Sequence, residues 1–407
     1  MFSIFLSSLL SLNLAIEAEA PPQSLTLSQA FDFAVTRSER ILSAREEIHV
    51  SKGLAKQSLQ RLLPNLVGGS VIGETIQWTG NLQIPLIDVS AGLSAVRAFQ
   101  SVKVAEASYE RQQETMLLAV AEAYLQAFMH QKRLELSARQ HEISQKHYAA
   151  AQRKADLQEI SKLDLKRAEL LVTKTQLDYA NHQASVRTSR GALADLLGCN
   201  MQVELSPVRG WELPSSMKTD DLLEEARIHR SDWKSVGISV QAAWLNSQSS
   251  LWQFMPTLQF QTGFLAPLKQ DMQWQWSLNV SLPLFDGYAR YGLAQTARAK
   301  WRQEKQKKQL LERGMALQIA GAKVELERAK EVLSLQKNLV EINEAALNSA
   351  QNRYQLGQAT SLDLLDEQTR LFQAQKDEQE AQTKLLQSQL ILRYVLGDPR
   401  KGLLNDG

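Results

Sequence analysis

A strict alternation of apolar and polar positions marks one segment in the second half of the chain. Its apolar positions fall at every second residue, at Met272, Trp274, Trp276, Leu278, Val280, Leu282 and Leu284. A period of two predicts a β-strand with one apolar face and one polar face. A shorter alternation over 258–264 predicts the partner strand, and residues 266–271 supply a turn. A β-hairpin is therefore expected over 256–285.

The first half of the chain repeats this pattern less sharply. Apolar positions over 66–78 and 82–86 predict a hairpin over 64–87, with its turn at Thr79–Asn81. The apolar faces of both hairpins need burial, either against helices of a soluble domain or in lipid. Strands of about 9–11 residues can cross a bilayer when tilted, but four strands cannot close a barrel and open edges are not tolerated in lipid. Burial in lipid would therefore require an oligomer.

Two proline-free runs predict very long helices. The runs at about 88–158 and 286–357 are rich in Ala, Leu, Gln, Glu, Lys and Arg, which favour helix. At 1.5 Å per residue, each helix would be roughly 105 Å long. Shorter helices are expected over about 26–62 and 219–254, and a return helix follows each long one. Two short helices stacked end to end would match the length of one long helix.

The chain consists of two copies of one unit. The stretch "AQRKADLQEISKLDL" from Ala151 aligns without a gap with "AQNRYQLGQATSLDL" from Ala350, and each copy ends at a glycine suited to a helix C-cap, Gly198 or Gly397. The expected division is a signal peptide at 1–20, repeat one at 21–198, a linker or equatorial segment at 199–216, repeat two at 217–397 and a C-terminal tail at 398–407.

The tip turn of repeat two, expected at 356–364, contains residues that end one helix and begin the next. Gly357 can take the positive φ of a C-cap, and Thr360 or Ser361 can cap the returning helix. Asp363 would then lie in the first turn, at the positive end of the helix dipole.

The tip turn of repeat one, expected at 157–165, has the same plan with one exception. Ser161 can cap the returning helix, with Asp164 in its first turn. Gln158 stands where repeat two has its glycine, so this turn must be capped differently.

Composition excludes several classes of protein. The 407 residues carry a formal net charge of +2, so no basic excess indicates a nucleic-acid partner. The single cysteine, Cys199, excludes an intramolecular disulfide, and no cofactor or metal site is predicted. The apolar N-terminus ends in Ala18-Glu19-Ala20, which fits a signal peptide, and no other run is long enough for a transmembrane helix. The export signal and the length of the strands favour lipid, and not helices, as the surroundings of the apolar hairpin faces.

Four features in tandem order resemble the TolC-type outer membrane efflux protein (outer membrane factor) family. They are "LTLSQAFDFAVTRSERI" from Leu25, "LPLFDG" from Leu282, "RYQLGQATSLDLLDEQ" from Arg353 and the terminal Leu396-Gly397. The resemblance implies a mainly α protein with a small membrane β part. In that family a homotrimer forms a 12-stranded β-barrel continuous with a 12-helix α-barrel. The protein would lie in the outer membrane of a Gram-negative bacterium, in contact with outer membrane lipid and with a large periplasmic part.

The resemblance also implies function and partners. The trimer would be the duct of a tripartite efflux or type I secretion system, without catalysis of its own. It would dock a periplasmic adaptor (membrane fusion) protein and an inner membrane pump. The docking tip turns would be formed by Gly357, Gln358, Ala359 and Thr360 in repeat two and by Gln158, Glu159, Ile160 and Ser161 in repeat one.

An aperture at the tips follows from the same resemblance. Asp363 and Asp366 match positions where acidic side chains ring the pore, and such rings attract cations. The alternative is that Asp363 only caps a helix and Asp366 is a solvated surface charge. In repeat one the corresponding residues are Asp164 and Arg167. Some members carry an arginine that ties neighbouring coils where this chain has Ala359, and we hypothesise that Arg167 takes over that role.

Other functions are less consistent with the sequence. No nucleophile, metal or phosphate-binding motif of an enzyme is found. A periplasmic coiled-coil adaptor or a structural protein remains the alternative, although two tandem copies with amphipathic strands do not fit an adaptor with a single hairpin. The sequence does not identify the exported substrate.

Overall fold

The described part of the chain covers both repeats. The computed structural model describes residues 24–72, 76–198, 204–267, 271–282, 284–356 and 358–403. The predicted signal peptide at 1–20, Cys199 and Gly357 lie outside the described residues.

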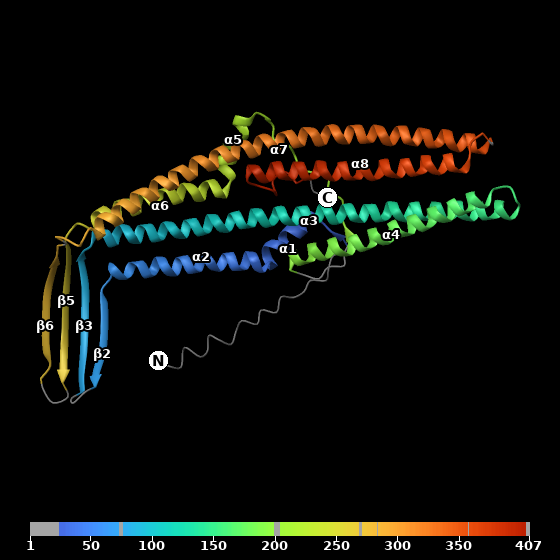
Figure 1. Ribbon diagram of the computed structural model, residues 1–407. Helices are drawn as coiled ribbons and strands as arrows, with labels where there is room; N and C mark the ends of the chain where they lie inside the picture. Colours follow the sequence, from blue (N-terminus) through green and yellow to red (C-terminus); the bar gives the residue numbers. More distant parts are fainter. Residues whose placement is uncertain are drawn as a thin grey trace.

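Two very long helices run the length of the molecule. Helix α3 spans Val89–Asp156 and α7 spans Ala289–Gln355, with 68 and 67 residues. These bounds lie within three residues of those predicted, and each helix is about 100 Å long. The sheet lies at one end of the molecule and the helix tips at the other (Figure 1). None of the helices in the described ranges is apolar enough over sufficient length to cross a membrane.

Shorter helices cover the long ones in two tiers. In the upper tier, next to the sheet, α2 (Glu39–Ser58) packs on α3, and α6 (Ser231–Trp252) packs on α3 and α7. In the lower tier, α4 (Lys162–Leu197) packs on α3, and α8 (Ser361–Leu396) packs on α7 and α3. Figure 1 shows α2 and α4 following one another along α3. The predicted stacking of short helices beside long ones is confirmed.

The two helices predicted before the hairpins are each broken, which corrects the predictions over 26–62 and 219–254. Helix α1 (Leu27–Arg37) ends at Ser38, with φ −65° and ψ 121°. Helix α5 (Thr219–His229) ends at Arg230, with φ −64° and ψ 121°. Both residues are extended and buried, and neither is a glycine or a proline. After α2, a 3₁₀ turn at Leu59–Arg61 leads into the sheet.

Each break lies against the end of another helix of the same repeat. Helices α4 and α8 end at Gly198 and Gly397, both at positive φ. A Cβ on Gly198 would lie 3.2 Å from the carbonyl oxygen of Arg37, and a Cβ on Gly397 would lie 2.6 Å from the backbone nitrogen of Arg230. Each glycine cap is therefore packed against the break in the neighbouring helix pair.

The four strands form one antiparallel sheet in which the two repeats meet. They are β2 (Asn65–Ile72), β3 (Ile76–Ile87), β5 (Thr257–Pro267) and β6 (Gln273–Ser281). Their order is β2-β3-β5-β6, so the inner pair joins repeat one to repeat two. The outer edges of β2 and β6 have no strand partner among the described residues.

One face of the sheet is lined by amides and the other is apolar. On the polar face the side chain of Gln83 donates to Gln259 at 3.0 Å, and that of Asn279 donates to Gln261 at 3.0 Å. On the apolar face Trp276 is 76% exposed. The chain itself therefore does not cover the apolar face.

The turn predicted at Thr79–Asn81 is wrong, because these residues lie inside β3. Gly80 pairs with Gly68 on one side and Phe264 on the other. A Cβ on Gly80 would lie 2.3 Å from the ring of Phe264, so the ring covers the space that a side chain would fill. Ile72 at the end of β2 pairs with Ile76 at the start of β3, and residues 73–75 are not described.

A buried core lies where the two tiers meet. The short strands β1 (Ser24–Leu25) and β4 (Glu204–Leu205) pair in parallel there. The hydroxyl of the fully buried Tyr124 lies 2.7 Å from the carbonyl oxygen of Leu25. The indole of Trp211 donates to the carbonyl of Pro399 at 3.0 Å. The described parts of the predicted linker and tail thus pack into the middle of the molecule.

The C-cap of α8 gives a stability prediction. Replacing Gly397 by alanine should cost about 1–3 kcal/mol, because φ is 101° and the new Cβ would overlap the backbone of Arg230. Gly314→Ala is the control: this glycine lies within α7 with open space around it, so alanine should stabilise the helix by up to about 1 kcal/mol. Thermal unfolding followed by circular dichroism measures both, and equal melting temperatures would contradict the packing described.

Candidate functional site

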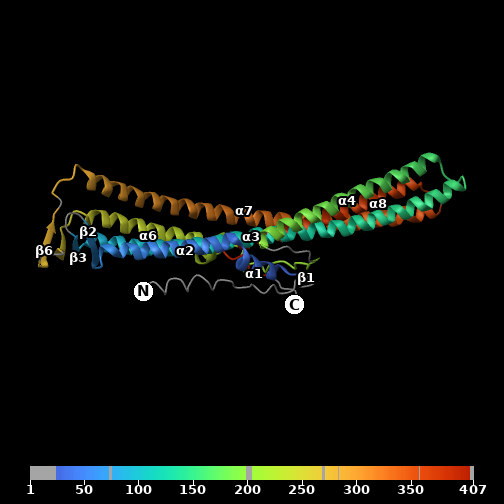
Figure 2. The ribbon, with the colours of Figure 1, turned by 90° about the horizontal axis from the view of Figure 1, so that it is seen from below.

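Two helix–turn–helix tips lie side by side at the end of the molecule opposite the sheet. One connects α3 to α4 and the other connects α7 to α8, and both views show the two tips together (Figures 1 and 2). All of the sequence-predicted site residues belong to these tips, and all but Gly357 are described.

The tip of repeat two is closed by a capping box. The Oγ1 of Thr360 accepts from the backbone N–H of Asp363 at 3.3 Å, and the Oδ2 of Asp363 accepts from the backbone N–H of Thr360 at 2.8 Å. The predicted N-cap Thr360 is therefore confirmed. The bond from the Thr360 backbone lowers the pKa of Asp363, followed by the bond from its hydroxyl. The carboxylate thus stays charged well into the acidic range.

The tip of repeat one is capped by Ser161. Its Oγ accepts from the backbone N–H of Asp164 at 3.1 Å and donates to Asp164 Oδ2 at 2.6 Å. The hydrogen bond from Ser161 is the main cause that lowers the pKa of Asp164. Arg167 lies 3.4 Å from Asp164, one turn along the same helix. Within the chain Arg167 therefore pairs inside its own helix, and its contact with a neighbouring coil stays a prediction.

Gln158 takes the conformation that glycine would supply. Its φ is +60°, a left-handed value unusual for a residue with a side chain. The N–H of Glu159 donates to the carbonyl of Lys154 at 2.8 Å, which closes the end of α3. In the other tip the N–H of Gln358 donates to the carbonyl of Arg353 at 2.8 Å. The first turn therefore ends its helix with the same type of bond, but with strain at Gln158.

One of the polar contacts between the two hairpins lies at the tips. The Nζ of Lys154, on α3, donates to the hydroxyl of Tyr354, on α7, at 3.0 Å and lies 5.0 Å from the centroid of its ring. The hydrogen bond to Tyr354 raises the pKa of Lys154, so the ammonium is charged at neutral pH. The sequence did not predict this pair. The alignment of the two repeats places Lys154 opposite Arg353 and gives no reason to connect Lys154 with Tyr354.

A largely apolar cavity of about 290 Å³ lies between the tips. Its wall includes Asp164 and Arg167 beside the linked pair, and its apolar part is formed by Ala150, Ala151, Ile160, Ala168, Leu362, Leu364 and Leu365. Asp363 and Asp366 do not line this cavity. The structure therefore separates the four predicted aperture residues into two lining the cavity and two on α8 outside it.

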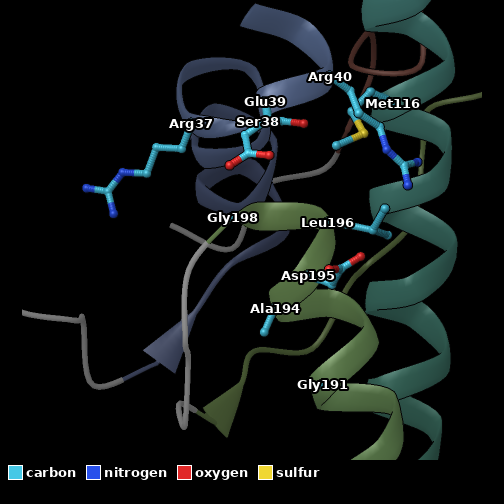
Figure 3. A pocket seen from close by; sticks show the side chains of 10 residues that line it. All are labelled: Arg37, Ser38, Glu39, Arg40, Met116, Gly191, Ala194, Asp195, Leu196 and Gly198. Carbon is cyan, nitrogen blue, oxygen red and sulfur yellow. The ribbon is translucent and has the colours of Figure 1, made fainter.

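A second hollow, of about 650 Å³, lies beside the break between α1 and α2 (Figure 3). Its charged residues are Arg37, Glu39, Arg40 and Asp195, from three helices. Figure 3 shows Arg37 pointing away from the other labelled side chains. Two positive and two negative charges balance here, so the hollow does not indicate a class of ligand.

The strained turn gives a prediction on stability. Gln158→Gly should stabilise the protein by about 0.5–1 kcal/mol, because glycine takes a positive φ without steric cost. Gln358→Gly is the control: Gln358 has no positive φ, so glycine there should be neutral or destabilising. Chemical denaturation compares the two, and a Gln158→Gly protein no more stable than the wild type would contradict a strained turn.

Comparisons with known proteins agree with the architecture. The outer membrane efflux protein family profile matches residues 39–199 and 222–398, one segment in each repeat. The protein CyaE of Bordetella pertussis is 26% identical over 294 residues, covering 68% of this chain and 61% of CyaE. This chain thus aligns with about three fifths of the length of that relative.

Two solved structures share the fold over nearly the whole chain. A structure of CusC, from work on its folding and transmembrane channel formation, has a TM-score of 0.82 at 16% identity and covers 94% of this chain and 96% of CusC. The open-state MtrE outer membrane channel of Neisseria gonorrhoeae has a TM-score of 0.81 at 18% identity, covering 92% and 89%. With both repeats matched, the chain belongs to the outer membrane efflux protein family and is an outer membrane protein of a Gram-negative cell, with its long helices in the periplasm.

Proposed function

We propose that three copies of this chain form the outer membrane duct of a tripartite efflux or type I secretion system, through which substrates pass passively. The observation that carries the proposal is the sheet, which has an uncovered apolar face, an amide-lined face and two unpaired edges. The family match and the channel folds of CusC and MtrE support it.

The unpaired edges require further copies if the apolar face lies in lipid. Each backbone group without a partner costs several kcal/mol in hydrocarbon, so open sheet edges do not occur there. The four strands alternate in direction, so β6 of one copy can pair antiparallel with β2 of the next. Three copies then give twelve strands in a closed sheet, with the amides facing water and the tryptophans facing lipid.

The helices offer a matching contact. Leu310, Leu317 and Val324 lie seven residues apart on α7 and are 72%, 77% and 62% exposed. On α4, Leu163 and Leu170 are 59% and 68% exposed, again seven residues apart. These helices are the outer members of the helix layer, and heptad spacing is typical of a coiled-coil seam. Contact between α7 of one copy and the α2 and α4 edge of the next would cover both rows.

The tips would dock a periplasmic adaptor that connects the duct to an inner membrane pump. Leu157 and Leu356 are 70% and 71% exposed at the two turns, which is consistent with a protein contact. Asp363 and Asp366 of three copies would ring the aperture and attract cations. The Lys154–Tyr354 contact would hold the two hairpins together when the aperture is narrow. The adaptor alternative is not supported by the family match.

Conductance tests the duct and its acidic aperture. The detergent-extracted protein should have the mass of three mature chains, each lighter than the 45.7 kDa full-length chain by its signal peptide, and should conduct ions in planar bilayers. Asp363→Ala with Asp366→Ala should lower the cation-to-anion permeability ratio by about twofold or more, because the ring loses six negative charges. Glu341→Ala with Glu344→Ala, an exposed pair of equal spacing on α7, is the control and should leave the ratio unchanged. A soluble monomer without conductance would favour the adaptor or structural alternative.

The fraction of time that the channel stays open tests the contact between the tips. Tyr354→Phe removes the hydroxyl but keeps the ring, so each of the three copies loses a bond worth about 1 kcal/mol, and each pair of tips should open about fivefold more often. Single-channel recording measures the open fraction. Tyr148→Phe is the control, since among the described residues its hydroxyl has no hydrogen bond. An unchanged open fraction in Tyr354→Phe would remove this contact from the closing mechanism.

A further inference from the structure

A hollow of about 970 Å³ lies against the upper tier, below the sheet. It is lined by residues of α2, α3, α6 and α7, including both outer helices of the layer. Figure 2 shows α7 set apart from α2, α3 and α6, so the layer is curved. A hollow that reaches both outer helices lies on the concave side of this layer. In the closed ring proposed above, the concave side faces the lumen.

The charged residues of this hollow are mostly basic. Arg97, Lys300 and Lys307 line it together with a single carboxylate, Glu304, which leaves two positive charges per chain. The guanidinium of Arg97 donates to the neutral side chain of Asn246. Only Lys307 is paired, with its Nζ 2.6 Å from Glu304. Within the described ranges, Arg97 and Lys300 have no carboxylate partner, so their charge is available to a solute.

The described strands above this hollow contain no charged side chain. The polar face of the sheet consists of uncharged side chains such as Gln83, Gln261 and Asn279. Just below the sheet, Arg61 pairs with Asp88 at 3.0 Å, and Arg290 lies 3.5 Å from Asp286. Below these pairs, Arg97 and Lys300 are the first lining charges of the described residues that have no carboxylate partner.

We propose that this hollow, repeated three times around the lumen, forms a basic belt that binds multivalent anions, so that the solutes exported through this duct include phosphorylated or polycarboxylate compounds. We define the basic belt as Arg97, Lys300 and Lys307. The inference rests on the proposed function, because the belt exists as a ring only in the closed assembly. Clefts lined by one sign of charge raise the local counter-ion concentration by 10-fold or more.

Salt screens the charges of the basic belt, so the salt concentration decides how far from the wall the belt acts. Twelve helices about 10 Å apart give a ring about 120 Å around, with a lumen about 14 Å in radius once the helix width is subtracted. The screening length is about 10 Å in 0.1 M salt and about 30 Å in 0.01 M salt. The field of the belt therefore reaches the lumen axis only at low salt. At higher salt it acts on solutes that touch the wall.

Helix α7 supplies a matched control. Arg298, Arg302 and Lys305 lie on the same stretch of α7 as the belt lysines. At 100° per residue they point about 180° away from Lys300 and Lys307. All three are exposed. Neutralising them removes the same charge from the same height of the duct, but from its outer surface.

The test is channel block by tripolyphosphate added on the barrel side, in about 0.01 M KCl. Arg97→Gln with Lys300→Gln and Lys307→Gln should raise the half-blocking concentration by about tenfold or more. Arg298→Gln with Arg302→Gln and Lys305→Gln should leave it unchanged. Lys300→Arg with Lys307→Arg should keep the block. Should the triple belt variant not form trimers, Lys300→Gln alone should still raise the half-blocking concentration, by about threefold.

The outcomes separate this inference from the proposed function. Equal block of the wild type and the belt variant would overturn the belt, and so would an equal loss of block in the outer-surface variant. If the wild-type protein does not conduct, the duct itself fails. In that case, tripolyphosphate binding to the detergent-solubilised protein is measured by calorimetry to test the belt by itself. If the belt variant binds tripolyphosphate as well as the wild type does, the belt is overturned.

Discussion

The structure depends on one constraint, the need of every backbone N–H and C=O group in a lipid-facing sheet for a hydrogen-bond partner. The sheet has an apolar face that its own helices leave bare, and two edges that its own strands leave unpaired. In water these edges would be tolerated, but in hydrocarbon they would not. In the proposed ring, one neighbouring copy pairs with the β2 edge and the other neighbouring copy pairs with the β6 edge. The exposed apolar rows on the outer helices fit the same proposal, because a ring that closed the sheet would also close the helix layer.

Local patterns predicted the elements of this fold, and long-range packing decided their details. The alternation around Trp274 and Trp276 and the proline-free runs are properties of neighbouring residues, so the strands and the two long helices could be predicted. The breaks at Ser38 and Arg230 could not, because the glycine caps that pack against them lie far away in the sequence. Gly80 looked like a turn residue because nothing in its own repeat shows that Phe264 of the other repeat covers it.

The candidate site shows the same division. Capping by Ser161 and Thr360 depends on residues three positions apart and was predicted. The contact between Lys154 and Tyr354 joins residues from different repeats, and no pattern in either repeat indicated it. The charge of the upper lumen was missed for a similar reason, since its cations come from different helices. The proposed duct thus has a basic zone near the sheet and an acidic one at the tips, about 80 Å apart along α7.

The tandem repeat has a consequence for assembly. The contact between β3 and β5 joins the two repeats within one chain, so it forms without any encounter between molecules. In the proposed ring, half of the six contacts between units are of this kind. Assembly then requires three bodies to meet instead of six, and its rate depends far less steeply on the amount of protein in the membrane. Covalent linkage gives the inner contact a high effective concentration, so the paired hairpins can form first and serve as a template for the next copy.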